Sequence, residues 1–267
     1  MNVLKKIVDI KQKMLNGIAS LDMQIVDHCN LNCCGCDHFA PLAKKWEIDI
    51  DVYKNLLQRL MHIKKDKNIY EFNIMGGEPF LHSRFIDICK ITKDILDCSK
   101  IVVVTNGILY EKNRKYYDEI FNVLNIKLSI SDYLDTNKMF YSLNLSKNDL
   151  SENNRVCCFN RTMDFDIIKN HEYKHLFSLV PCAQLNYNGD LFSCIVPANI
   201  HIFNDYFREE YYVEKGKDYI NIYEVDDLNE IIAMNNAKEI PFCKFCKNQT
   251  IKKWEVSNKL KNEWIYK

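Results

Sequence analysis

The sequence lacks a charge excess of either sign, because its 36 lysines and arginines balance its 36 aspartates and glutamates. No global basic field therefore points to nucleic acid or to an anionic membrane as a partner. It also lacks a run of about 18 apolar residues, which a membrane-spanning helix requires. Near the start, Lys5, Lys6 and Asp9 interrupt the apolar positions, unlike the core of a secretory signal. We expect a cytoplasmic protein with neither a nucleic-acid nor a membrane partner.

Cysteine, by contrast, is abundant, with 12 in 267 residues. In a secreted protein such cysteines would form disulfides, whereas in a cytosolic protein they more often bind metal or take part in catalysis. Because no secretory signal is apparent and several cysteines are closely spaced, the sequence favours metal binding.

Apolar periodicity alternates between strands and helices over the first half of the chain. The pattern predicts helices over 3–18, 50–64, 83–97 and 112–122, and strands over 21–26, 69–75, 101–105 and 125–131. Such alternation indicates βαβ units and an α/β fold with a parallel sheet. The unusual loops of this half all follow a predicted strand, where parallel sheets and barrels bind their ligands.

The pattern changes after about residue 145. A further strand is predicted over 161–168, and a β-hairpin over 185–194 turns at Asn188, Gly189 and Asp190. We therefore expect three parts: an N-terminal helix within 1–20, a core domain over 21–175, and a small α+β domain over 176–267 that contains the hairpin.

Three cysteines follow the first predicted strand with the spacing C-x3-C-x2-C: Cys29, Cys33 and Cys36. A 4Fe–4S cluster ordinarily takes four thiolates, so three from one loop would leave one iron open to a small molecule. The alternative is a structural zinc loop completed by His28 or His38, for which this spacing is less typical.

This cysteine loop, placed after the first strand of an α/β pattern, resembles that of the radical S-adenosylmethionine superfamily. The resemblance implies a partial (β/α)6 barrel and a 4Fe–4S cluster whose open iron chelates the methionine part of S-adenosylmethionine. Reductive cleavage of that cofactor to a 5′-deoxyadenosyl radical is the implied chemistry. The family usually has an aromatic residue before the third cysteine, where this sequence has Gly35. Phe39 is the candidate to replace its adenine contact.

Further motifs occur in the order that this resemblance requires. Gly76, Gly77 and Glu78 follow the second strand and resemble the family motif that holds the methionine amino group. Alone, they would equally suit an ordinary turn. The resemblance assigns cofactor contacts also to Asn106, after the third strand, and to two serines at the end of the fourth, Ser129 and Ser131.

A second cysteine set lies in the last third of the chain and comprises Cys182, Cys194, Cys243 and Cys246. Two pairs of thiols can close a zinc or an iron–sulfur site, and spacing alone does not separate the two. The pattern resembles the auxiliary-cluster extension called SPASM or, when shortened, Twitch. That resemblance implies a second, closed 4Fe–4S cluster that accepts an electron from the substrate.

The implied activity is oxidation of a small polar substrate such as a sugar or cyclitol alcohol, with a flavodoxin or ferredoxin as electron donor. Peptide modification, sugar epimerisation and dehydration are the enzymatic alternatives, and a zinc or iron–sulfur sensor is the non-enzymatic one. Arg155, Cys157 and Arg161 are the catalytic candidates. The alternative to a catalytic role is an ordinary surface position for the two arginines and a buried position in the core for the cysteine.

Overall fold

The computed structural model describes residues 16–131, 182–235, 240–245 and 255–265. Predicted features within 1–15, 132–181, 236–239, 246–254 and 266–267 lie outside the described residues. These features include residues 3–15 of the predicted N-terminal helix, the strand over 161–168 and the boundary at 175/176. The division into domains therefore stays a prediction. The predicted end of the N-terminal helix at residue 18 is wrong, because Gly17 and Ile18 form a short strand.

A seven-stranded sheet forms the centre of the described structure, in the order β6-β5-β4-β2-β7-β8-β9. Its first four members along the chain are β2 (Ser20–Gln24), β4 (Glu71–Met75), β5 (Lys100–Thr105) and β6 (Ile126–Ile130). All four are parallel to their neighbours, which confirms the predicted α/β fold. A separate two-stranded pair joins β1 (Gly17–Ile18) to β3 (Asn68–Ile69). Closure into a barrel stays a prediction.

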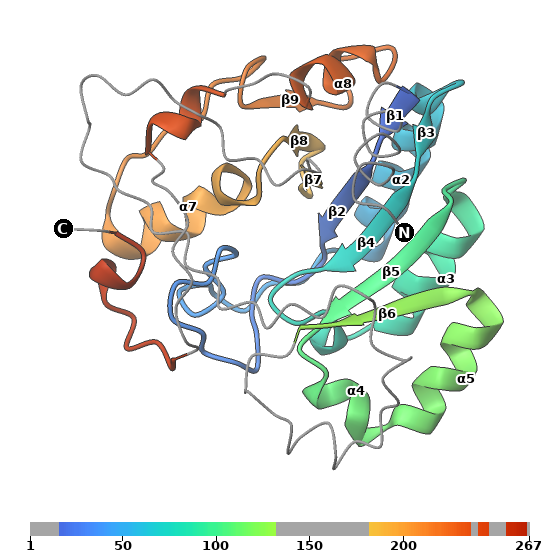
Figure 1. Cartoon of the computed structure of the whole chain (residues 1–267), viewed down its shortest axis with the longest axis horizontal. Helices are drawn as coiled ribbons and strands as arrows, with labels where there is room; N and C mark the ends of the chain where they lie inside the picture. The colour runs from blue at the N-terminus through green and yellow to red at the C-terminus, as the bar shows by residue number, and fades with distance from the viewer. Residues whose placement is uncertain (1–15, 132–181, 236–239, 246–254, 266–267) are drawn as a thin grey trace, which may run out of the picture.

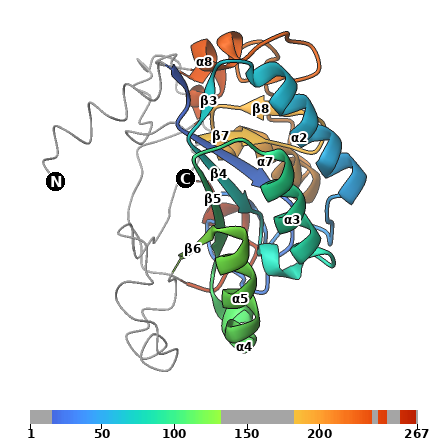
Figure 2. The same cartoon turned by 90° about the vertical axis from the view of Figure 1, so that its right-hand side faces the viewer.

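Helices connect these strands and cover one side of the sheet (Figures 1 and 2). They are α2 (Ile50–Lys64), α3 (Phe85–Ile95), α4 (Ile108–Lys112) and α5 (Arg114–Leu124), with the short helix η1 (Pro79–Leu81) before α3. The side chain of Asp49 caps α2 by accepting from the amides of Asp51 (2.8 Å) and Val52 (3.2 Å). The apolar stripe of α2 is buried and includes Leu56, Leu57, Leu60 and Ile63. Its spacing is the one that predicted this helix.

β2 is buried on both of its faces. Leu21 and Met23 belong to the apolar core that the helices cover. Because side chains alternate along a strand, Ser20, Asp22 and Gln24 point to the opposite face. One side of β2 thus stabilises the fold, and the other presents a polar surface.

The predicted hairpin is present and extends the same sheet. β7 (Cys182–Leu185) lies parallel to β2, and β8 (Asp190–Phe192) returns antiparallel to β7. Gly189 has φ +83° in the connecting turn, a conformation that favours glycine. The side-chain oxygen of Asn186 accepts from the amides of Asn188 (2.9 Å) and Asp190 (3.0 Å) and fixes this turn.

The C-terminal part packs around a second apolar cluster, on the side of the sheet away from α2 and α3 (Figure 1). Phe39, Phe203, Phe242 and Trp264 are all buried in it. The remaining elements are α7 (Ile195–Phe207), β9 (Tyr219–Asn221), α8 (Asn229–Asn235), η2 (Pro241–Phe245) and η3 (Lys261–Glu263). No helix in the described part of the chain is long and apolar enough to span a membrane.

Candidate active site

The cysteine loop occupies the connection between β2 and α2, at the carboxyl end of a central parallel strand. Within it, the Cys29 sulfur accepts the Leu31 amide at 3.3 Å. Gly35 has φ +67°, in the left-handed region that an aromatic residue adopts only under strain. The local backbone therefore explains why glycine stands where the family usually has an aromatic residue.

Gly76 and Gly77 let the next loop approach the backbone that leads into the cysteines. A Cβ on Gly77 would lie 2.2 Å from the carbonyl oxygen of His28, and one on Gly76 would lie 2.4 Å from that of Val26. Both distances are far below contact, so no larger residue fits without displacing the chain. The Gly77 amide donates to the Val26 carbonyl at 2.8 Å. These glycines are thus required for contact between two strand-end loops.

Glu78 joins this second loop to a third one. Its Oε1 accepts from the Thr105 hydroxyl (2.7 Å) and its Oε2 from the Asn106 amide (2.9 Å). The side chain is fully buried, and burial raises the pKa of Glu78 to about 7, against the opposing effect of these hydrogen bonds. A bound ammonium group would favour the ionised carboxylate, but the predicted contact of Glu78 with the methionine amino group stays a prediction.

Asn106 completes the connection back to the cysteine loop. Its side-chain nitrogen donates to Asn30 Oδ1 (2.7 Å) and lies 3.7 Å from the Cys29 sulfur. The three loops after β2, β4 and β5 therefore form one hydrogen-bonded network at one edge of the sheet. Ser131, at the end of the neighbouring β6, donates its amide to the Thr105 carbonyl at 2.8 Å. Ser129 is partly buried within β6.

The electrostatics of the cysteine loop suit a positively charged iron centre. Burial raises the pKa of Cys29 to about 12 and that of Cys36 to about 12, and in each case the nearby Cys33 raises it further. A metal cluster would relieve both effects, because it neutralises thiolates that solvent does not stabilise. The donor set therefore fits a thiolate-bound cluster. No three His, Cys, Asp or Glu side chains among the described residues are already grouped around a single metal position.

Phe39, the residue predicted to contact adenine, lies in the second apolar cluster. It is 1% exposed and packs against Phe203, with ring centroids 5.5 Å apart, and against Trp264, at 6.5 Å. Its contact with adenine stays a prediction, and this packing does not support it.

Two members of the second cysteine set are described with their side chains. Cys194 precedes α7 and Cys243 lies in η2, and both border the second apolar cluster. These two residues, which are far apart in the sequence, therefore pack against the same apolar cluster. Cys182 begins β7, and Cys246 lies outside the described residues. The four-cysteine site remains a prediction, as do the roles of Arg155, Cys157 and Arg161, which the described ranges do not include.

A buried polar network was not anticipated from the sequence. Asp22 Oδ1 accepts from the side-chain amide of Asn73 at 2.6 Å, and Asp22 Oδ2 accepts from Gln184. The three residues face one another across β4, β2 and β7. Burial raises the pKa of Asp22 to about 6. The alternation of polar and apolar residues in Ser20–Gln24 is the signal that would have revealed this polar face.

This network leads toward the cysteine loop through Gln24. The Gln24 side chain donates to Asp27 Oδ1 at 2.6 Å and accepts from His38 Nδ1 at 2.7 Å. His38 follows Cys36 by two positions. Polar side chains therefore extend from the inside of the sheet to the cysteines.

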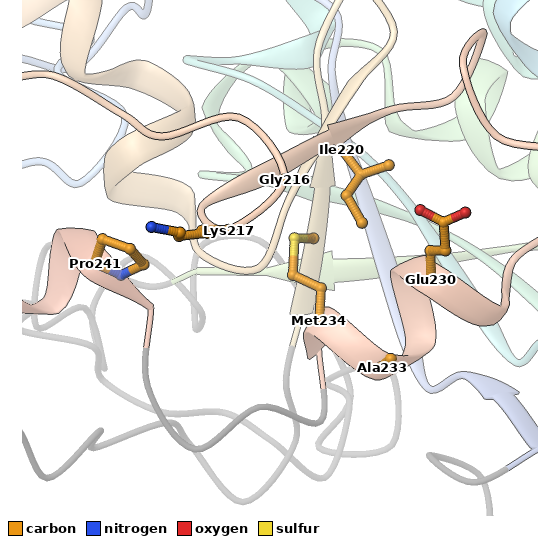
Figure 3. Close-up of a pocket in the computed structure, with 7 residues that line it drawn as sticks. All are labelled: Gly216, Lys217, Ile220, Glu230, Ala233, Met234 and Pro241. Carbon is orange, nitrogen blue, oxygen red and sulfur yellow. The ribbon is translucent and has the colours of Figure 1, made fainter.

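A surface hollow of about 430 Å³ is lined by residues that belong to none of these loops (Figure 3). It is formed by β9, α8 and η2 and is lined by Gly216, Lys217, Ile220, Glu230, Ala233, Met234 and Pro241. None of the predicted cofactor or catalytic residues lines it, so it is not part of the candidate active site.

Comparisons with known proteins identify a family for the first half of the chain. The family described as "4Fe-4S single cluster domain" matches residues 16–156. GTP 3′,8-cyclase of Microcystis aeruginosa is 26% identical over 120 residues, which are 44% of this chain and 36% of the relative. The S-adenosylmethionine-dependent nucleotide dehydratase of Oncorhynchus mykiss is 30% identical over 124 residues, 45% of this chain and 35% of the relative. The chain thus matches about a third of the length of these curated relatives.

A solved structure has the same fold over most of the chain. The crystal structure of BtrN in complex with AdoMet and 2-DOIA has a TM-score of 0.54 and 18% sequence identity. The match covers 88% of this chain and 96% of that one. At this identity the likeness extends to the fold alone.

Proposed function

We propose that this chain, which belongs to the radical S-adenosylmethionine superfamily and to the family of 4Fe–4S single-cluster domains, is an oxidising enzyme. Its proposed substrate is a small polar molecule. The network that joins the cysteine loop, Glu78 and Asn106 is the observation that carries this proposal. It brings thiols, a carboxylate and amide groups together at one end of the parallel strands, where α/β folds bind ligands.

The residues have distinct proposed roles. Cys29, Cys33 and Cys36 would hold the cofactor cluster, and Glu78 would bind the methionine amino group. Asn106 is bonded to both loops, so it would keep the carboxylate and the thiols in a fixed relative position. Asn106, Ser129 and Ser131 would contact the ribose or carboxylate of S-adenosylmethionine.

Two clusters would divide the redox chemistry. When bound, the first cluster would supply the electron that cleaves S-adenosylmethionine to a 5′-deoxyadenosyl radical. The second cluster would accept the electron that the substrate gives up. The cysteines that we assign to the acceptor are Cys182, Cys194, Cys243 and Cys246. An external donor such as flavodoxin or ferredoxin would reduce the first cluster in the cytoplasm.

The buried polar face of the sheet supports a polar substrate. Ser20, Asp22 and Gln24 share this face of β2, with Asn73 and Gln184 beside them. Asn73 Oδ1 is buried and has no hydrogen-bond partner among the described residues. A substrate hydroxyl group could supply the missing donor, because buried acceptors are rarely left unpaired. Sugar and cyclitol alcohols carry several such groups.

Anaerobic reconstitution tests this function. The protein should bind about eight irons, as two four-iron clusters require. With dithionite and S-adenosylmethionine it should release 5′-deoxyadenosine. A set of deuterated cyclitol and sugar alcohols should then include one that transfers deuterium to this product and becomes a carbonyl compound. Bound zinc with no 5′-deoxyadenosine would refute the proposal. Deuterium transfer without carbonyl formation would point to epimerisation or dehydration instead.

A further inference from the structure

The cysteine loop is bonded to a segment that lies more than 200 positions later in the chain. This segment, residues 255–265, is called here the C-terminal strap. The Cys34 amide donates to the Glu255 carbonyl at 2.9 Å, and the Ser257 amide donates to the Asn32 carbonyl at 2.7 Å. Cys33 and Val256 face each other between these two bonds as an antiparallel bridge. In Figure 1 the C-terminal segment, in red, approaches the blue loop that follows β2.

Two side chains strengthen this contact. The Asn32 side-chain nitrogen donates to the Ser257 carbonyl at 2.7 Å. The Trp264 indole nitrogen donates to the carbonyl of Cys36 at 3.1 Å, so the strap reaches both ends of the segment between Asn32 and Cys36. Trp264 is 1% exposed, which shows that this donor is held within the protein rather than at its surface.

The strap has its own internal support. The Glu263 carboxylate accepts from the amides of Asn258 (2.7 Å) and Leu260 (3.3 Å) and from the Ser257 hydroxyl. Lys261 forms an ion pair with Glu209, just after α7. The strap is therefore a shaped segment anchored to the C-terminal part, and not an extended tail that happens to touch the loop.

The cysteine loop needs support from outside itself. Between Gln24 and Ile50 the chain contains no helix or strand, only isolated bridges. Fixing the backbone of each residue costs conformational entropy, so a loop without regular structure is ordered only by added contacts. Four hydrogen bonds join residues 32–36 to the strap. Two of them connect backbone groups, and the other two use the side chains of Asn32 and Trp264.

We propose that the C-terminal strap is a positioning element for the cofactor cluster, with Trp264 and the backbone of residues 255–257 holding the backbone of the cysteine loop in place so that its thiols can bind iron. This inference rests on the proposed function. The strap also covers one side of the loop, and solvent exposure is one of the quantities that set the potential of an iron–sulfur cluster. Neither Trp264 nor Ser257 contacts the thiols in any described hydrogen bond, so both act through the loop.

The test compares two strap variants with two controls in the reconstituted holoprotein. Trp264→Phe removes the indole donor and keeps an aromatic ring, and Ser257→Pro removes the amide that bonds to Asn32. Phe207→Leu alters the same apolar cluster, since the ring centroids of Phe207 and Trp264 lie 6.2 Å apart, and it removes no hydrogen bond to the cysteine loop because a phenylalanine side chain donates none. Val256→Ala trims a side chain that is 59% exposed and leaves the strap backbone intact.

Two readouts do not depend on turnover. The first is the rate of iron release from the reduced cluster to a chelator, which should rise roughly fivefold in Trp264→Phe, the effect of losing one hydrogen bond of about 1 kcal/mol. The second is the midpoint of a redox titration followed by electron paramagnetic resonance. It should become less negative in both strap variants, because added water stabilises the more highly charged reduced cluster. Both controls should match the wild type.

The outcomes separate this inference from the proposed function. If the wild type binds no cluster, the proposed function fails and the inference fails with it. If the wild type is loaded and active while both strap variants keep its release rate and potential, the strap has no positioning role. Equal changes in Phe207→Leu and Trp264→Phe would also overturn the inference, because they would reflect general loosening of the apolar cluster. Should Ser257→Pro fail to fold, Trp264→Phe alone decides, with the alkylation rate of Cys33 and Cys36 in the apoprotein as the supporting measurement.

Discussion

The two cysteine regions of this protein differ in how their residues are brought together. Around Cys29, hydrogen bonds through Asn106 and Glu78 join three loops that each follow a parallel strand. Around Cys194 and Cys243, the shared feature is an apolar cluster that both residues border. The first region is organised by the sheet, and the second by side-chain packing between segments distant in the sequence.

This difference bears on what each region can do. A site built on strand ends is held by a backbone that changes little between homologous folds, which suits a cofactor shared by a superfamily. A site built by packing of the C-terminal segments can vary without disturbing the sheet. We therefore expect cofactor cleavage to depend on the first region, and the fate of the substrate electron to depend on the second.

Replacing a cysteine of the first region has the largest expected effect. Cys33→Ala removes a predicted ligand that lies between two others, and we expect it to abolish both the first cluster and 5′-deoxyadenosine formation. Cys34→Ala is the matched control, because it changes the adjacent thiol while its backbone bond to Glu255 is kept. Iron analysis and chromatography of the products check both. If Cys34→Ala lost activity and Cys33→Ala kept it, Cys34 rather than Cys33 would be the cluster ligand.

Replacing a cysteine of the second region should separate the two functions. Cys194→Ala is expected to lower bound iron from about eight to about four per chain, as the loss of one four-iron cluster requires. Cleavage of S-adenosylmethionine should continue, and the oxidised product should disappear. A variant that retains about eight irons would show that Cys194 is not a ligand.

A methyl group on Gly77 should damage the contact between the first two loops. Gly77→Ala places a Cβ 2.2 Å from the His28 carbonyl oxygen, and we expect the free energy of unfolding to fall by about 3 kcal/mol, at the upper end of the usual cost of overpacking. Gly216→Ala is the control. Its φ of +78° costs about 1 kcal/mol, but no atom lies within 4 Å of the added carbon. Urea unfolding of both variants measures the difference, and equal losses would contradict the close approach.

The buried carboxylate of Asp22 predicts a smaller, pH-dependent effect. Because its pKa is raised from 3.8 to about 6 in the folded protein, its ionisation opposes folding. The stability present below about pH 4 should therefore decline as the pH rises through about 6, by roughly 2–3 kcal/mol for a shift of this size. The Asp22→Asn variant should lack this decline, while the pH dependence of stability that comes from the raised pKa of Glu78 should remain. Unfolding free energies of both proteins between pH 4 and pH 8 test this, and parallel curves would refute it.

The sequence predicted the parallel half of the fold well, because each of its signals is local. The apolar stripe of α2 consists of residues three and four positions apart, so it can be read along the chain. The glycines before Glu78 are recognisable as a motif, although the contact that requires them is made with Val26 and His28 in another loop.

The sequence did not predict that β7 lies beside β2, nor the strap contact between Trp264 and Cys36, because pairing across more than 150 positions leaves no periodic trace. The packing of Phe39 against Phe203 likewise joins positions that are far apart in the sequence.

The central claim is that the loop carrying Cys29, Cys33 and Cys36 holds a cluster with one iron open to S-adenosylmethionine. Electron paramagnetic resonance of a reduced variant in which Cys194 and Cys243 are both replaced by alanine tests it most directly, because only the first cluster should remain. Our account predicts one reduced four-iron signal whose g values shift when S-adenosylmethionine is added. A signal that the cofactor leaves unchanged, or the absence of any signal, would contradict it.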